Sequence, residues 1–102
     1  MACYLLSPEA EEDLLGIRDY LVAQGGKRLA HYILRDMTAA FRLLASHPEA
    51  GHRREDLTPL PVKFWRVFSY LIVYDPIARP LAIVRVLDGR REVVSILNRS
   101  RE

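Results

Sequence analysis

Apolar residues recur along this chain with two different periods, and the period changes near the middle of the sequence. Between residues 10 and 44 they are spaced three or four apart, which places them on one face of an α-helix. Between residues 62 and 87 they form short runs separated by turn residues, which is typical of β-strands. The pattern predicts a helical first half and a strand-rich second half.

Two helices are expected in the first half. The first begins at Ser7-Pro8, because a serine can cap free amide groups and a proline fits the first helical position. The Gly25-Gly26 pair ends this helix, and residues 27–46 repeat the helical spacing. Because the link between the two helices is so short, we predict an antiparallel helical hairpin.

The remaining elements are short strands and a final polar segment. We expect strands at residues 2–6, 62–68, 70–75 and 81–87. The last three are joined by short links, which favours an antiparallel meander. Residues 90–97 are expected to form a last helical turn, and residues 98–102 a polar tail.

The predicted fold class is therefore α+β, with the order β-α-α-β-β-β and a single domain over residues 1–102. The helical hairpin packs on one face of an antiparallel-rich sheet, followed by a short C-terminal helix or tail. Because two helices cannot cover both faces, the opposite face is expected to be partly open. Strict alternation along the last strand places Leu81, Ile83, Arg85 and Leu87 on one side, and the smaller residues between them under the helices.

Charge is distributed unevenly along the chain. Residues 1–50 hold 5 basic and 7 acidic side chains, giving −2, and residues 51–102 hold 10 and 6, giving +4. Of the 15 basic residues, 13 are arginines, whose planar guanidinium binds carboxylate and phosphate bidentately. The basic second half thus favours an acidic partner, either a protein surface or a nucleic acid.

Several classes of protein are not supported by the sequence. No apolar run approaches the roughly 20 residues of a membrane span, and the N-terminus does not resemble a signal peptide. A single cysteine fits a reducing compartment, so we expect a cytoplasmic protein without a membrane partner. Paired metal ligands, an activated nucleophile and a glycine-rich phosphate loop are all missing from the sequence, so no metal or cofactor is expected.

A metal-free ribonuclease remains open, because it needs only a base, an acid and cations around the phosphate. Arg66, Arg85 and Arg91 are expected near one end of the sheet, and the candidates for proton transfer are Tyr70, Tyr74 and His52. The alternative is that Tyr70 and Tyr74 are ordinary packing residues of a strand.

Three segments resemble the ParE branch of the RelE/ParE superfamily of bacterial toxins. They are LSPEAEEDL at residues 6–14, the connector formed by Leu44, Pro48, Gly51, Arg54 and Asp56-Leu57, and the closing strands YLIVY at 70–74 and RVLDGRRE at 85–92. The resemblance covers nearly the whole chain and rests on the order and spacing of these segments together. It implies the toxin of a type II toxin-antitoxin pair, held inactive by a small antitoxin with an acidic C-terminal segment.

Members of this superfamily differ in their target. ParE-like toxins poison DNA gyrase, whereas RelE-like toxins cut messenger RNA in the ribosome, which would make nucleic acid a partner. Asp88 stands where the superfamily usually has histidine, and an aspartate is a poor proton donor at neutral pH. The sequence thus favours noncatalytic inhibition of gyrase. There are two alternatives. One is a ribosome-dependent endonuclease that uses Arg66, Arg85, Arg91 and Tyr70. The other is an inactivated toxin retained as an antitoxin-binding module.

The resemblance also implies which side chains contact the antitoxin or the target. The expected surface consists of charged residues of the basic half, namely Arg53, Arg54, Arg66, Arg85, Asp88, Arg90 and Arg91.

Overall fold

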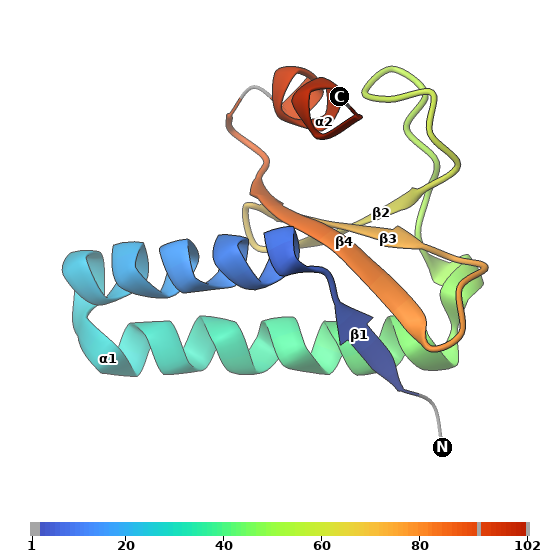
Figure 1. The fold of residues 1–102 in the computed structure, drawn as a ribbon. Coiled ribbons are helices and arrows are strands. Elements are labelled where there is room, and N and C mark those ends of the chain that lie inside the picture. Colours follow the sequence, from blue (N-terminus) through green and yellow to red (C-terminus); the bar gives the residue numbers. More distant parts are fainter. Residues whose placement is uncertain (1–2, 92, 102) are drawn as a thin grey trace.

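The computed structural model describes residues 3–91 and 93–101 and has an α+β architecture (Figure 1). In chain order the elements are β1 (Tyr4–Leu6), α1 (Pro8–Ser46), the 3₁₀ helix η1 (Pro48–Ala50), β2 (Lys63–Val67), β3 (Tyr70–Asp75), β4 (Leu81–Asp88) and α2 (Val93–Arg101). The predicted fold class and order of elements are confirmed, with strand boundaries within about two residues of those expected.

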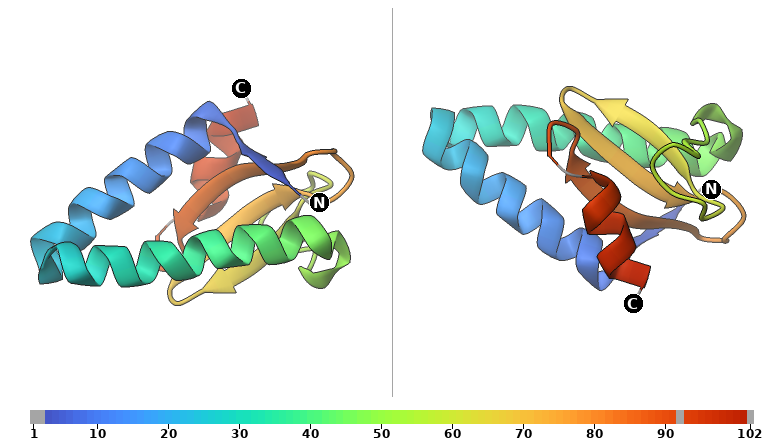
Figure 2. Two further views of the ribbon diagram at one scale, coloured as in Figure 1. Left: turned by 90° about the horizontal axis from the view of Figure 1, so that it is seen from below. Right: turned by 90° about the horizontal axis from the view of Figure 1, so that it is seen from above.

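Helix α1 contains the predicted helical hairpin. Gly26 lies inside it with φ 83° and ψ 179°, a conformation that breaks the helix and that glycine adopts without the steric cost of a Cβ atom. The two arms, residues 8–25 and 27–46, spread apart from this bend (Figure 2). Ser7 caps the first arm as predicted, because its Oγ accepts a 3.0 Å hydrogen bond from the Ala10 amide.

The four strands form one mixed sheet in the order β1-β4-β3-β2. The expected antiparallel meander is confirmed for β2, β3 and β4, and β1 pairs with β4 in parallel. Strand β1 reaches only as far as the pairing of Leu6 with Ile83, so the second half of β4 has no strand on that side. The start of α1 lies beside this uncovered part of β4.

The two arms of α1 cover one face of the sheet. The core between them is built from apolar side chains that are at most 8% exposed, among them Met37, Phe41, Leu44, Ile72 and Ile83. Tyr74 is fully buried here: its hydroxyl donates to the Pro48 carbonyl at 2.7 Å and accepts from the Gly51 amide at 2.9 Å. Burial raises the pKa of this phenol. Tyr74 is therefore a packing residue that also fixes the turn after α1.

The prediction that the opposite face is partly open is wrong. Helix α2 and the segment 52–62 lie over it (Figure 1), and a second core joins Val62, Phe64, Val73, Val93 and Leu97. The expected polar tail after Leu97 is also wrong, because α2 continues to Arg101, although residue 102 lies outside the described part of the chain. A helix of this length supplies the apolar cover that the hairpin cannot provide.

The prediction of strict alternation along β4 is also wrong. The pairing steps from Val73 opposite Arg85 to Tyr74 opposite Ile83, so that a β-bulge interrupts the register at this point. Leu81 and Ile83 face the hairpin before the bulge, and Val86 faces it afterwards. The residues under the helices therefore come from both predicted sides of β4, with Leu81 and Ile83 from one side and Val86 from the other.

No helix within residues 3–91 and 93–101 combines the length and the apolar character that a membrane crossing needs.

Candidate functional site

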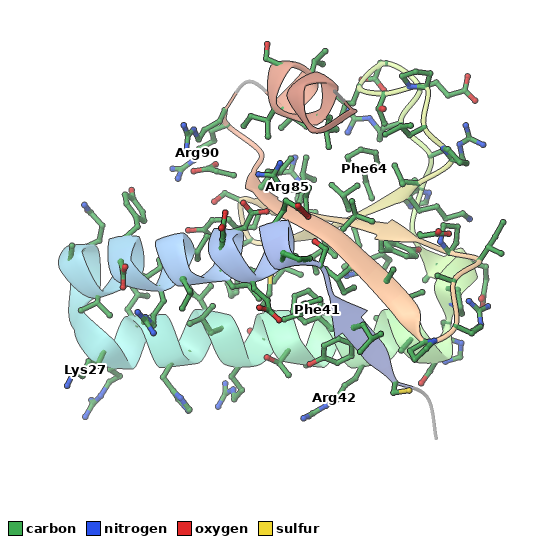
Figure 3. All side chains as sticks on the ribbon, viewed as in Figure 1. Lys27, Phe41, Arg42, Phe64, Arg85 and Arg90 are labelled. Atoms are coloured by element: carbon green, nitrogen blue, oxygen red, sulfur yellow. The ribbon has the colours of Figure 1, made fainter. Side chains whose placement is uncertain are left out.

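Arg85 lies where the end of β1 exposes the edge of β4, close to the first arm of α1 (Figure 3). Its Nε and Nη2 donate to the two carboxylate oxygens of Asp13 at 2.8 and 2.9 Å. Asp13 also accepts from the Val86 amide at 2.9 Å, so one carboxylate satisfies both the guanidinium and the free strand edge. The side chains of Arg85 and Asp13 are 16% and 14% exposed, and the pair raises the pKa of Arg85.

The same end of α1 closes the edge with Ser7. Its amide donates to the Ile83 carbonyl at 3.0 Å, and its Oγ donates to the Val84 carbonyl at 2.7 Å. Ser7 and Asp13 thus replace the missing strand with hydrogen bonds from a helix N-terminus. The sequence explained the acidic start of this helix by capping, and Asp13 shows that one of these acids also has a long-range structural role.

A depression of about 410 Å³ opens beside this pair, and we call it the Arg85 depression. Its charged and tyrosine lining comprises Glu12, Asp13, Tyr20, Tyr70, Arg85, Asp88 and Arg91. Three of the four residues proposed for a nuclease, Tyr70, Arg85 and Arg91, therefore do line one depression. They share it with three carboxylates, which would repel a phosphate group.

Tyr70 and Asp88 are both unsuited to proton transfer near neutral pH. Tyr70 is 4% exposed, and burial, with a smaller contribution from the charge of Asp88, raises its pKa. Asp88 accepts from the Arg90 Nε at 3.0 Å and Nη2 at 2.8 Å, and these bonds lower the pKa of its carboxyl. The phenol therefore stays protonated and the carboxylate stays ionised, so neither is a ready base or acid, respectively.

A second cavity, which we call the arginine pocket, lies on the other side of Arg91. It has a volume of about 250 Å³ and is lined by Arg54, Leu57, Arg66, Leu71, Gly89, Arg91, Val93 and Val94. Arg54 comes from the segment before β2, Arg66 from β2 itself, and Arg91 from the turn before α2. Three arginines that are far apart in the sequence thus converge on one concave surface.

The three arginines of the arginine pocket differ in whether a carboxylate of the protein pairs with them. Arg54 forms a bidentate pair with Asp56, with distances of 3.0 and 2.8 Å. Arg66 and Arg91 form no salt bridge within the described part of the chain, and both are exposed. The pocket therefore keeps positive charge that an incoming anion can neutralise.

The predicted surface of charged residues is thus divided. Arg53 pairs with Glu55 at 3.8 Å, and Arg54, Arg85 and Arg90 pair with Asp56, Asp13 and Asp88. The expected grouping of Arg66 with Arg85 and Arg91 is replaced by two groups that share only Arg91. Arg54 is the member that the nuclease hypothesis omitted. The resemblance placed Arg54 in the expected contact surface, but its position beside Arg66 and Arg91 follows from the fold of the segment 52–62.

The outer side of the helical hairpin carries an apolar groove. One part, of about 470 Å³, is lined by Leu6, Leu14, Leu15, Met37 and Phe41 together with Glu11, Arg18, Leu34 and Thr38. A second part, of about 590 Å³, shares Arg18 and Leu34 with it and continues along the arms toward Lys27. Leu15 is 52% exposed, so this groove presents apolar area that an amphipathic helix can cover.

Comparison with known proteins gives a consistent assignment. The family model of the ParE toxin of the type II toxin-antitoxin system parDE matches residues 4–93. A chain of a chromosomal ParDE TA system from P. aeruginosa superimposes with a TM-score of 0.72 at 19% sequence identity, over 86% of this chain and 96% of that one. A search of the curated proteins finds no match. The family match spans most of the chain, and we conclude that the protein belongs to the ParE toxin family of type II toxin-antitoxin systems.

Proposed function

We propose that this protein is the toxin of a toxin-antitoxin pair and that it inhibits DNA gyrase without catalysing a reaction. The observation that carries the proposal is the match to the ParE toxin model over residues 4–93, because gyrase is the target that this branch of the superfamily implies. The fold alone does not decide the target, since a fold is shared by proteins of different activity.

The geometry of the Arg85 depression supports a noncatalytic mode of action. A nuclease needs a free cation for the phosphate and groups that exchange protons near neutral pH. Here Arg85 is held by Asp13 at 2.8 Å, and the pKa of Tyr70 is raised while that of Asp88 is lowered. Arg85 is therefore not free to bind phosphate. Arg91 lines the same depression without a salt bridge in the described residues, but neither Tyr70 nor Asp88 is suited to exchange protons beside it.

The partner that holds the toxin inactive is proposed to be an antitoxin with an amphipathic helix. The apolar groove along the hairpin offers a matching surface, lined by Leu14, Leu15, Leu34 and Met37 and flanked by the charged Arg18 and Glu11. Burying apolar side chains of a helix in such a groove contributes about 25 cal/mol for each Å² of apolar area removed from water. Helix-in-groove docking is a common mode of peptide recognition.

The target is tested by two assays with the same purified protein. In a gyrase supercoiling assay we expect the wild type to inhibit, with accumulation of cleaved DNA complexes, and in an in vitro translation assay we expect no effect. The variant Tyr70→Phe removes only the phenolic hydroxyl, and we expect it to inhibit gyrase as the wild type does. A stop in translation with cleaved transcripts, abolished by Tyr70→Phe, would instead establish the ribosome-dependent nuclease. Inactivity in both assays would favour an inactivated toxin.

The antitoxin surface is tested by a charge placed in the groove. Leu15→Lys puts an ammonium group at a position that is 52% exposed in the free protein, so the fold is preserved while a docked apolar helix would bury the charge. We expect the affinity for the antitoxin encoded beside the toxin gene to fall at least about tenfold. Ile77→Lys, at a site that is 79% exposed in the loop between β3 and β4, is the matched control and should bind normally. Equal affinity of both variants would place the antitoxin elsewhere.

A further inference from the structure

The turn between β2 and β3 holds a phenylalanine in a backbone conformation that suits a smaller residue. Phe68 has φ 56°, in the left-handed region where glycine and asparagine are common and a bulky side chain is strained. Among the described residues no other residue with a side chain has a positive φ. Phe68 is 48% exposed, so burial in a core does not offset the strain. Strain of this kind is concentrated at functional sites, which makes Phe68 a candidate for contact with a partner.

Phe68 belongs to a small exposed aromatic cluster. Its ring contacts that of Tyr32 on the second arm of α1, with ring centroids 6.1 Å apart, and Tyr32 is 50% exposed. The guanidinium carbon of Arg35 lies 5.4 Å from the centroid of the Tyr32 ring. Arg28 precedes Tyr32 by one helical turn and so lies on the same helix face. We call Arg28, Tyr32, Arg35 and Phe68 the Tyr32–Phe68 patch, and Figure 2 shows the β2–β3 turn beside the second arm.

The backbone next to Phe68 is also held by the turn that follows β4. The Ser69 carbonyl accepts a 2.7 Å hydrogen bond from the Gly89 amide. A Cβ atom at position 89 would lie 3.0 Å from this carbonyl, so glycine permits the close approach. The turn is thus fixed between α1 and the end of β4, and Phe68 is held in place before a partner arrives. Such preorganisation reduces the entropy cost of binding.

The charges beside the two rings select the kind of partner. Arg28 forms no salt bridge within the described residues, and Arg35 lies 3.8 Å from Asp36 with both side chains exposed. Aromatic rings together with arginines are typical of the residues that dominate binding between proteins. The unpaired positive charge favours a protein surface that carries carboxylates around an apolar area.

Two other partners fit the patch less well. A nucleic acid base would need a free ring to stack on, but the Tyr32 ring already contacts Phe68 and Arg35, and Asp36 would repel a phosphate. In a symmetric contact with a second copy of this chain, the arginines of both copies would meet. The patch also shares no residue with the groove along the helical hairpin. It is therefore a separate surface from the one assigned to the antitoxin.

We propose that the Tyr32–Phe68 patch is the surface that binds gyrase. The two rings pack against an apolar area of the gyrase protein, and Arg28 and Arg35 face carboxylates at its margin. The inference rests on the proposed function for the identity of the partner, and it adds where on the toxin this contact lies.

The test measures binding to purified gyrase in the absence of DNA, for the wild type, Phe68→Asn and Tyr32→Ala. Asparagine tolerates the left-handed conformation and alanine favours a helix, so we expect both variants to fold. The affinity should fall at least about tenfold in each, and inhibition of supercoiling should weaken in parallel. Ile77→Asn, at a site 79% exposed in the loop between β3 and β4, is the matched control and should change the affinity less than about twofold. An unchanged urea midpoint and unchanged antitoxin affinity show that the fold is intact.

The contribution of the charges is measured separately. Arg28→Gln and Arg35→Gln should each lower the affinity for gyrase about fivefold at low salt, and less at high salt, because salt screens exposed charges. Arg79→Gln removes an exposed arginine from the loop between β3 and β4 and should change the affinity by less than about twofold. Equal losses in all three variants would mean that net charge, rather than this patch, attracts gyrase.

The outcomes separate this inference from the proposed function. If the wild type binds gyrase and Phe68→Asn and Tyr32→Ala bind it equally well, this inference is wrong and the proposed target stands. If the wild type stops translation and does not bind gyrase, the proposed target is wrong and the patch loses its assigned partner. Binding of a single-stranded oligonucleotide that is lost in the same two variants, with gyrase affinity retained, would assign the patch to nucleic acid and contradict the proposal.

Discussion

The Arg85 depression and the arginine pocket share Arg91 in their linings. Arginine side chains have opposite roles in these two regions. In the Arg85 depression the side chain of Arg85 is 16% exposed, and both carboxylate oxygens of Asp13 accept hydrogen bonds from its guanidinium group. In the arginine pocket Arg66 and Arg91 are exposed and have no salt bridge in the described residues. Arg85 links β4 to α1 through its hydrogen bonds with Asp13, whereas Arg66 and Arg91 remain available to a partner.

The difference follows from solvation. A guanidinium that is largely removed from water needs a carboxylate, because the cost of burying an unpaired charge is several kcal/mol. Arg85 meets this need with Asp13, a residue that is 72 positions away in the sequence. An exposed guanidinium stays hydrated and can exchange that water for an incoming anion. Counting arginines along the chain therefore does not locate a binding surface.

The largest effect is expected when the buried pair is broken. Asp13→Asn removes the charge that faces Arg85 and weakens the acceptor for the Val86 amide, so we expect the free energy of unfolding to fall by about 2–4 kcal/mol. Urea denaturation measures this loss. Asp19→Asn is the matched control on the same arm of α1, because Asp19 pairs with Arg18 at 3.0 Å but the two side chains are 72% and 53% exposed. The free energy of unfolding of Asp19→Asn should fall by less than about 0.5 kcal/mol.

A double substitution measures the interaction between Asp13 and Arg85 apart from their contacts with other residues. Asp13→Asn combined with Arg85→Met leaves no unpaired charge, so it should recover part of the stability that the single variants lose. Losses that simply add would mean that Asp13 and Arg85 act independently. The contrast between the two regions would then have no basis in ion pairing.

The main elements of the fold were predictable because local signals decide them. Ser7-Pro8 specifies the start of α1, the bend follows from Gly26, and the short links between β2, β3 and β4 allow only an antiparallel meander. Helix α2 was underestimated, although Val93, Ile96 and Leu97 have the spacing of an apolar helical face. That spacing was a usable signal that the second sheet face would be covered.

The site was less predictable because long-range geometry determines it. The bulge between Val73 and Tyr74 has no marker such as a glycine, yet it decides which residues of β4 face the hairpin. The pairing of Asp13 with Arg85 depends on where β1 ends, and the position of Arg54 depends on the path of the segment 52–62. Each is a tertiary outcome that composition and periodicity do not encode.

A smaller effect is expected at Asp88, which lines the Arg85 depression. Arg90 lowers the pKa of this carboxyl below its ordinary value of 3.8, so the ionised form is favoured in the folded state. The stabilisation is present above the unfolded pKa and is lost as the pH falls through the lower, folded value. The stability difference between the wild type and Asp88→Asn should thus be constant above about pH 5 and shrink in more acidic solution. Chemical denaturation at several pH values measures it, and a difference that grows on acidification would reverse the assigned direction.

The smallest effect on stability is expected in the arginine pocket. Arg66→Gln and Arg91→Gln should each change the free energy of unfolding by less than about 0.5 kcal/mol, because exposed side chains without a salt bridge contribute little to folding. Thermal and urea denaturation check this against Asp13→Asn. A loss above about 1 kcal/mol in either variant would mean that the arginine pocket has a structural role like that of the Arg85 depression. Native stability of both variants would instead mean that folding alone gives no reason to place these two cations on one concave surface.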